Sequence, residues 1–443
     1  MKDKESVFLN SDINKLFYKY LINSVLGMLA VSFCILADTM FIGQGIGSDG
    51  LAALNICIPI FNLFNGLGLL FGMGGATALS ISRGKGEIVE SQRIFTKSII
   101  IAILVGITLS TLGKIFTEKI GYILGANISN IYMVKEYLSG VLIFSFSYIL
   151  AHTTSAFIRN DHNPRLAMIA TVTSGLSNVI LDYLLIFIFD MGIKGAGLAT
   201  SIASLINLLI LLTHFISKKC SLRFIKFKIN VKDIPRILFN GLPSFIVEIS
   251  SGIVIFIFNL KLLNIVGNIG VSAYSIIANV SLVAAAIFTG ISQAMQPIIS
   301  VNYGANKIDR VKRVRKKGLK TSIIVGLSFY IIGILFPQFI VGVFTSEKGQ
   351  IVDITVNAIR YYFLAFIFMG INIVNGAYYQ SMEHRILSNA ISLSRGIILI
   401  IIGITILPVF LGVNGVWLSA VFAEVLTLII TCLYVYKKKM TLI

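Results

Sequence analysis

The chain has 443 residues, of which 56% are hydrophobic and only 13% are charged, and its mean hydropathy is +0.90. A soluble globular domain is about one quarter charged, so this composition excludes a soluble protein. The net charge of +18 is common in nucleic-acid-binding proteins. In a membrane protein, however, it arises from Lys and Arg in cytoplasmic loops, and we expect no nucleic-acid partner.

Apolar runs of about 20 residues recur along the chain, long enough to cross a hydrocarbon core about 30 Å thick as helices. The short alternating strands of an outer-membrane barrel do not fit such runs. The sequence therefore predicts an all-α integral membrane protein. The twelve predicted spans are 18–43, 51–79, 96–116, 137–158, 166–189, 194–216, 241–265, 270–300, 319–343, 356–380, 386–410 and 414–436.

Lysine and arginine gather on one side of the predicted membrane. Most of the 37 basic residues fall on the side that holds both termini, notably in the stretches KKCSLRFIKFKINVK and NKIDRVKRVRKKG. Because basic loops stay in the cytoplasm, we predict cytoplasmic termini in the plasma membrane, with both stretches against anionic lipid headgroups. The first stretch lies in a predicted linker, 217–240, between an N-terminal bundle, 1–216, and a C-terminal bundle, 241–443.

The two halves of the chain repeat each other. A gap-free shift of 220 residues aligns many small and basic residues, among them Ser80 with Ser300, Gly84 with Gly304, and Arg93 with Arg313. Since six spans are an even number, both copies insert in the same direction, and we expect a pseudo-two-fold axis along the membrane normal. Parallel repeats of this kind are typical of transporters, and we expect a monomer.

Acidic residues inside the spans are candidates for function, because a charge at mid-membrane costs roughly 2.5–3.5 kcal/mol. Asp38 lies in the first span and Asp182 in the fifth, at similar depth. Asn178 and Asp182 end a polar stripe of residues spaced three or four apart, and Thr200 begins a similar stripe on the next span.

Two carboxylates that meet in a low-dielectric site cannot both stay charged cheaply, so one holds a proton or a cation binds between them. We therefore predict a coupling site for H⁺ or Na⁺ at Asp38 and Asp182, with oxygens of Asn178 and Thr200 as further Na⁺ ligands. The alternative is a pair of acids capped by neighbouring hydroxyls. The four cysteines form no CxxC pair, so we expect no disulfide, no other metal and no cofactor.

Other polar residues inside the spans have simpler interpretations. Glu248 in the seventh span is a candidate second acid, whereas Glu424 is expected to pair structurally with Arg395. His152 and His214 are expected to be hydrogen-bonded core residues.

Several stretches resemble the multidrug and toxic compound extrusion (MATE) transporters: ADTMFIGQGIGSDGLAALNICIPIF, FIRNDHNPRLAM, SNVILDYLLIFIFDMGIKGAGLATSIAS, GLPSFIVE and QAMQPIISVNYGANK. The resemblance implies two six-helix bundles, a central cavity and drug export driven by H⁺ or Na⁺. It is closest to the DinF-like branch, whose cation site matches Asp38, Asn178, Asp182, Thr200 and Tyr137. The NorM-like branch has acids on the seventh and tenth helices; Glu248 matches the former, but the tenth carries Asn372 and Asn375.

The resemblance implies amphipathic, often cationic substrates, which aromatic and Met side chains bind through apolar and cation–π contacts. Candidate cavity residues are Phe61, Phe64, Met73, Tyr274, Met295, Met369 and Tyr379. A lipid-linked sugar flippase of the same superfamily is an alternative, but it would need more Arg and Lys in the spans than Arg395 and Lys261. A membrane-embedded transferase would need clustered acids for Mg²⁺, which the sequence does not show.

Overall fold

The computed structural model describes residues 2–226, 234–345 and 349–438, and within these residues it contains helices and no strands. The helices of the N-terminal half are α1 (Lys2–Asn10), α2 (Ile13–Gly45), α3 (Ser48–Gly84), α4 (Ile88–Ile115), α5 (Thr117–Ile123), α6 (Ile131–Leu142), α7 (Ser145–Asn160), α8 (Pro164–Tyr183), the π-helical turn η1 (Leu184–Ile188) and α9 (Gly192–Ile216). Those of the C-terminal half are α10 (Ile234–Val266), α11 (Asn268–Gly304), α12 (Ile308–Leu335), α13 (Pro337–Phe344), α14 (Gln350–Tyr362), α15 (Ala365–Ser381), α16 (Arg385–Leu393), the π-helical turn η3 (Ser394–Ile398), α17 (Leu399–Leu411) and α18 (Val413–Lys437).

Ten helical segments of the described chain are long and apolar enough to cross a membrane, and two bent helix pairs bring the number to twelve. The prediction of an all-α protein with twelve spans is therefore confirmed. The bent pairs are α6 with α7, at 49°, and α14 with α15, at 43°. At the first bend the freed backbone N–H of Phe144 donates to the Ser201 hydroxyl at 3.1 Å, because a backbone donor inside a membrane needs a partner.

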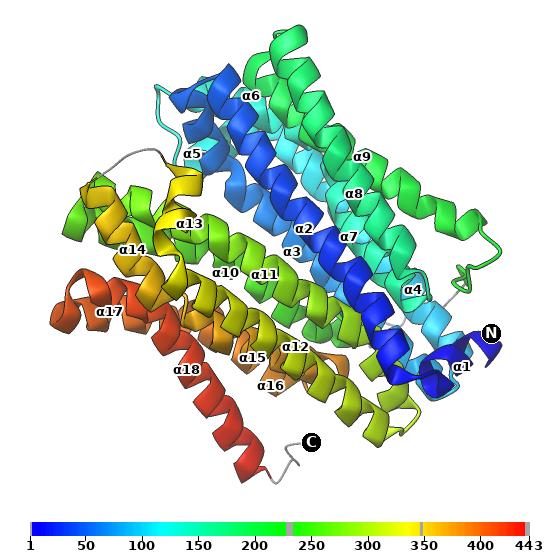
Figure 1. The fold of residues 1–443 in the computed structure, drawn as a ribbon. Helices are drawn as coiled ribbons and strands as arrows, with labels where there is room; N and C mark the ends of the chain where they lie inside the picture. Colours follow the sequence, from blue (N-terminus) through cyan, green and yellow to red (C-terminus); the bar gives the residue numbers. More distant parts are fainter. Residues whose placement is uncertain (1, 227–233, 346–348, 439–443) are drawn as a thin grey trace. The chain divides into compact units, whose positions relative to one another are not determined.

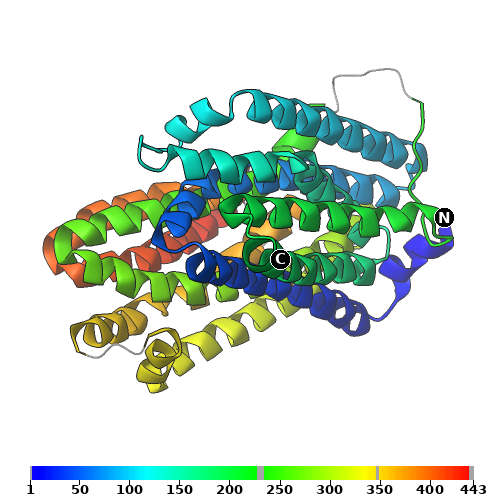
Figure 2. The same cartoon turned by 90° about the horizontal axis from the view of Figure 1, so that it is seen from above.

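The described chain packs as two compact units, which Figures 1 and 2 colour from blue to red along the sequence. Unit 1 comprises residues 1–249 and 300–306, and unit 2 comprises residues 250–299 and 307–443. Helix α10 begins at Ile234, earlier than the predicted start of the seventh span at 241, because Pro235 is tolerated in a first helical turn. Part of the predicted linker, 227–233, lies outside the described residues.

Small residues bring the helices of unit 1 close together. Gly140 on α6 faces α9 so closely that a Cβ there would lie 2.8 Å from the Lys194 carbonyl oxygen and 2.8 Å from the Leu198 nitrogen. Between helices in a membrane, where no hydrophobic effect draws them together, such close packing is a main source of association energy. This contact fixes α6, and with it Tyr137, against α9.

Candidate functional site

Asp38 on α2 and Asp182 in the last turn of α8 lie together, as the sequence predicts. Their helices run side by side (Figure 1), and a side chain on Gly175 of α8 would overlap the Cys34 sulfur of α2. Asp182 is fully buried, Asp38 is half-buried, and the two carboxyl groups lie close enough to interact with each other. Because two ionised carboxylates repel each other, a shared proton or a cation between them would stabilise this arrangement.

The surroundings of the acid pair contain several polar atoms without partners. Apart from their mutual contact, both Asp182 oxygens and Asp38 Oδ1 are buried and accept no hydrogen bond from the described residues. The buried hydroxyls of Tyr137 and Tyr148 also lack hydrogen-bond partners there, and both lie within electrostatic range of the two acids. Such groups cost about 1–3 kcal/mol each when unpaired, so the cluster is suited to receive a proton or a cation. Sequence reasoning misses Tyr148, because the bend before it breaks the helical periodicity.

The predicted polar stripe on α8 faces α9. The Ser174 hydroxyl donates to the Ala203 carbonyl oxygen at 2.7 Å, and Asn178 Nδ2 approaches the Thr200 hydroxyl oxygen at 3.4 Å. Thr200 in turn donates to the Ala196 carbonyl oxygen at 3.0 Å. Asn178, about one turn before Asp182 on α8, is therefore in contact with Thr200 on the neighbouring helix α9.

A π-helical turn, η1, follows Asp182 almost directly. Such turns are rare and occur frequently at functional sites. The turn packs against the end of α2: a Cβ on Gly45 would overlap Ile186 and lie 3.0 Å from the Phe187 ring. Contacts therefore link the helix of Asp38 to the turn that begins beside Asp182.

Aromatic side chains pack against the two tyrosines near the acid pair. The Phe61 ring lies 6.0 Å from Tyr137 and 5.8 Å from Tyr148, and the Phe64 ring stacks on Tyr148 at 6.3 Å between centroids. Phe61 is half-buried, whereas Phe64 is buried. Of the predicted substrate residues, Phe61 thus contacts Tyr137 of the predicted ion site, and both Phe61 and Phe64 contact Tyr148, which was not predicted.

The other predicted cavity residues belong to both units. Met73 belongs to a buried apolar cluster of unit 1, and in unit 2 buried Tyr274 stacks on Phe258 at 4.8 Å. Met295 is buried where a Cβ on Gly318 would overlap its sulfur. The last two predicted residues are half-buried Met369 and buried Tyr379.

The remaining intramembrane acids have partners. Glu248 Oε1 lies 3.5 Å from the Asn65 amide of α3, a contact inside unit 1. In unit 2, Arg395 in η3 binds Glu424 of α18 with an Nη2–Oε1 distance of 2.7 Å, and the Asn372 amide donates to Glu424 Oε2 at 2.7 Å. The predicted structural pairing of Glu424 with Arg395 is confirmed, and it neutralises the guanidinium that a pyrophosphate site would need.

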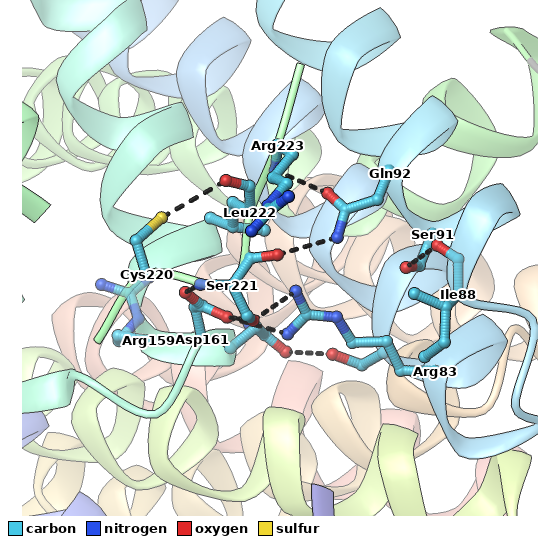
Figure 3. Close-up of polar contacts among 12 residues, drawn as sticks. Arg83, Ile88, Ser91, Gln92, Arg159, Asp161, Cys220, Ser221, Leu222 and Arg223 are labelled. Carbon is cyan, nitrogen blue, oxygen red and sulfur yellow. Dashed lines mark hydrogen bonds and ion pairs between the residues drawn. The ribbon is translucent and has the colours of Figure 1, made fainter. Parts of the chain in front are cut away.

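A second polar cluster surrounds Asp161, in the connection after α7 (Figure 3). Its Oδ1 accepts from Arg83 at 3.0 Å and from the Ser221 hydroxyl, and its Oδ2 accepts from His214 Nε2 and the Ser221 backbone N–H, both at 2.8 Å. Burial alone raises the pKa of Asp161, but these donors stabilise the carboxylate and lower its pKa to about 2. His214 is a hydrogen-bonded core residue, as predicted.

The Asp161 cluster also gathers metal-type ligands, since atoms of Asp161, His214 and Cys220 lie within 4.8 Å of one another. The Asn163 amide oxygen accepts from the Leu166 N–H, so its nitrogen faces His214 Nδ1, at 3.3 Å. Nδ1 is then an acceptor, and Nε2 carries the proton that it donates to Asp161. With Asp161 accepting from Arg83, Ser221 and His214, these contacts are those of a hydrogen-bonded anchor.

Comparison with known proteins covers nearly the whole chain. The sequence model of the MatE family matches residues 24–184 and 243–405. The proteins named "Multidrug export protein MepA" of Staphylococcus saprophyticus and of Staphylococcus aureus strain MSSA476 are 26% and 27% identical over 458 and 440 aligned positions, covering 98% of this chain and 96% of each relative. The fold matches the structure titled "Outward-facing conformation of a multidrug resistance MATE family transporter of the MOP superfamily", with TM-score 0.91, and a MOP superfamily transporter from Pyrococcus furiosus, with TM-score 0.90. Both are 20% identical, and each match covers 98% of both chains.

Proposed function

Because the chain belongs to the MATE family of membrane transporters, we propose that it exports amphipathic, cationic organic compounds, including drugs, in exchange for H⁺ or Na⁺. Membership of this family makes it a transporter and not an enzyme. The names of the curated relatives, multidrug export proteins, support small molecules as the cargo. We place the coupling ion at Asp38 and Asp182.

One observation supports this site above all others: buried Asp182 and half-buried Asp38 lie within interaction range, and both oxygens of Asp182 lack a hydrogen-bond partner among the described residues. The pair is poised to hold either one proton or one cation. Carboxylate, amide and hydroxyl oxygens also fit Na⁺, a hard cation, and we assign Asn178 and Thr200, which contact each other, as its further ligands.

The proposed cycle uses the charge of the pair as a switch. When H⁺ or Na⁺ enters from outside, the repulsion between Asp38 and Asp182 is relieved, and α2 shifts or bends against α8 and η1. Glycines at the contacts of α2, Gly45 and Gly175, leave backbone surfaces that can slide. Because Phe61 contacts Tyr137 beside the acids, that movement alters an aromatic surface suited to an organic cation.

Drug efflux from everted vesicles tests the coupling site. Dye release is driven separately by a proton gradient and by a sodium gradient, for the parent and for Asp38→Asn and Asp182→Asn. We expect each variant to lose efflux under the gradient that drives the parent, since an amide neither takes up a proton nor balances a cation. Asp49→Asn, an exposed acid in the first turn of α3, is the matched control and should pump like the parent. Parental efflux by both site variants would refute the assignment.

The orientation, partners and organisation of the chain follow the same proposal. Both termini are placed in the cytoplasm, where the exposed basic residues of 217–226 and 307–320 contact anionic lipids. The bundles 1–216 and 241–443 act as the two transport lobes of a monomer. Labelling of single cysteines from each side of sealed vesicles checks the orientation.

A further inference from the structure

The ends of α3 and α11 cross at two glycines, within unit 1. A Cβ on Gly84 would overlap the Val301 carbonyl oxygen and lie 2.8 Å from the Ala305 nitrogen. A Cβ on Gly304 would overlap the Ile81 carbonyl oxygen and lie 3.0 Å from the Ile81 Cα. The two backbones therefore touch directly, and any larger residue at either glycine would push them apart.

The contact is made by the same motif on both helices. Gly84 and Gly304 are equivalent in the internal repeat, and so are Ser80 and Ser300, about one turn earlier. Each helix thus presents Ser-x-x-x-Gly, a small-xxx-small pattern that permits close helix contact in membranes, and both serines are fully buried. A surface that meets its own repeat is self-complementary, as at a two-fold interface.

Helix α3 is held firmly at this end. Arg83, directly before Gly84, binds Asp161 and the Ser221 hydroxyl, each at 3.0 Å (Figure 3). Gln92 of α4 donates to the Ser221 carbonyl oxygen at 2.8 Å. These contacts fix the end of α3 to the connection after α7 and to the segment around Ser221.

Helix α1 reaches the same end of α11. The Asn302 amide donates to the Phe8 carbonyl oxygen at 3.1 Å. The Phe8 side chain is fully buried, with its ring 4.2 Å from His162 and 5.7 Å from Tyr20 of α2. Helix α1 thus ties the last turns of α11 to α2 and to the connection that holds Asp161.

We propose that the glycine crossing of α3 and α11 is the inner gate of the transport cycle, shut in this structure and strapped by α1. The inference rests on the proposed alternating-access function. Opening toward the cytoplasm requires α11 to leave α3, which breaks the Gly84–Gly304 contact and releases Asn302 from Phe8. Transport then depends on the ability of the two backbones to meet again.

Thiol labelling of a buried gate position tests the proposal apart from transport. Ser300→Cys is placed in a background without the native cysteines, in everted vesicles exposed to a membrane-impermeant maleimide. In the Ser300→Cys protein with no further change, the new thiol should react slowly with the maleimide. Addition of Gly84→Ala or Gly304→Ala should raise the labelling rate severalfold and lower efflux. Gly27→Ala in α2 is the matched control, because its new Cβ would lie 3.7 Å from its nearest neighbour, the Met168 Cα.

Removal of the strap provides a second test that adds no atoms to the crossing. Phe8→Ala and Asn302→Ala should raise the labelling rate in the same direction, and they decide the question if the glycine variants do not fold. Labelling of every folded gate and strap variant at the parental rate would overturn the gate. The coupling site is judged separately: if Asp38→Asn pumps normally while the gate variants are labelled faster, the gate stands and the ion site fails.

Discussion

Removal of the Asp161 carboxylate should cost far more stability than a loop substitution usually does. Asp161→Ala takes the acceptor from Arg83, His214 and Ser221, and it leaves a guanidinium whose side chain is 2% exposed. Breaking a buried ion pair on one side costs about 3–5 kcal/mol, since the remaining charge stays desolvated. We expect a loss of that size in the free energy of unfolding, measured by SDS titration of the purified protein in mixed micelles.

Two further variants separate the lost charge pairing from the lost side chain. Arg83→Met with Asp161→Leu removes both charges and should recover the part of the loss that the unpaired guanidinium causes, because apolar replacements of a buried pair are often neutral. The loss that comes from His214 and the Ser221 N–H without their acceptor should remain. Asp49→Ala, an exposed acid, should stay within about 0.5 kcal/mol of the parent. A loss below about 1 kcal/mol for Asp161→Ala, or a double variant as unstable as the single one, would refute the reasoning.

The same cluster and the pair in unit 2 yield two more predictions. The folded pKa of Asp161 lies near 2, below its ordinary value of 3.8, so its carboxylate adds about 2 kcal/mol above pH 4 that disappears as the pH falls through 2; in Asp161→Asn this part of the acid unfolding curve should be missing. Glu424→Ala leaves Arg395 charged and unpaired, at a cost of about 3–5 kcal/mol, whereas Arg395→Ala leaves Glu424 with its hydrogen bond from the Asn372 amide and should cost less. Equal melting temperatures of these two variants would contradict that asymmetry.

The spans could be predicted from the sequence, but their bends could not. Apolar length alone decides that a segment crosses the membrane, and the twelve predicted spans all correspond to helices or bent pairs. The bend between α6 and α7 depends on the Ser201 hydroxyl, which lies on a different helix and rescues the Phe144 N–H. The hydropathy of residues 137–158 does not depend on Ser201, so it cannot indicate the bend.

The acid pair was predictable for a reason that does not extend to the rest of the site. Charges deep in apolar spans are rare and expensive, so Asp38 and Asp182 stand out in the sequence. Asp161 does not, because an acid between two helices suggests a solvated loop. It is buried by Ser221 and its neighbours, about sixty positions later in the chain, and sequence periodicity does not report such a contact.

The π-helical turn after Asp182 has a mechanical consequence. It accommodates one residue more than an α-helical turn, and one residue corresponds to about 100° of rotation about a helix axis. If the widened turn moved along the chain by a single position, the side chain facing Gly45 would change from Ile186 to a neighbour. A shift of the π-helical turn by one residue would thus rotate the side chains next to Asp182 by about 100° about the helix axis. The helix can rotate in this way without bending.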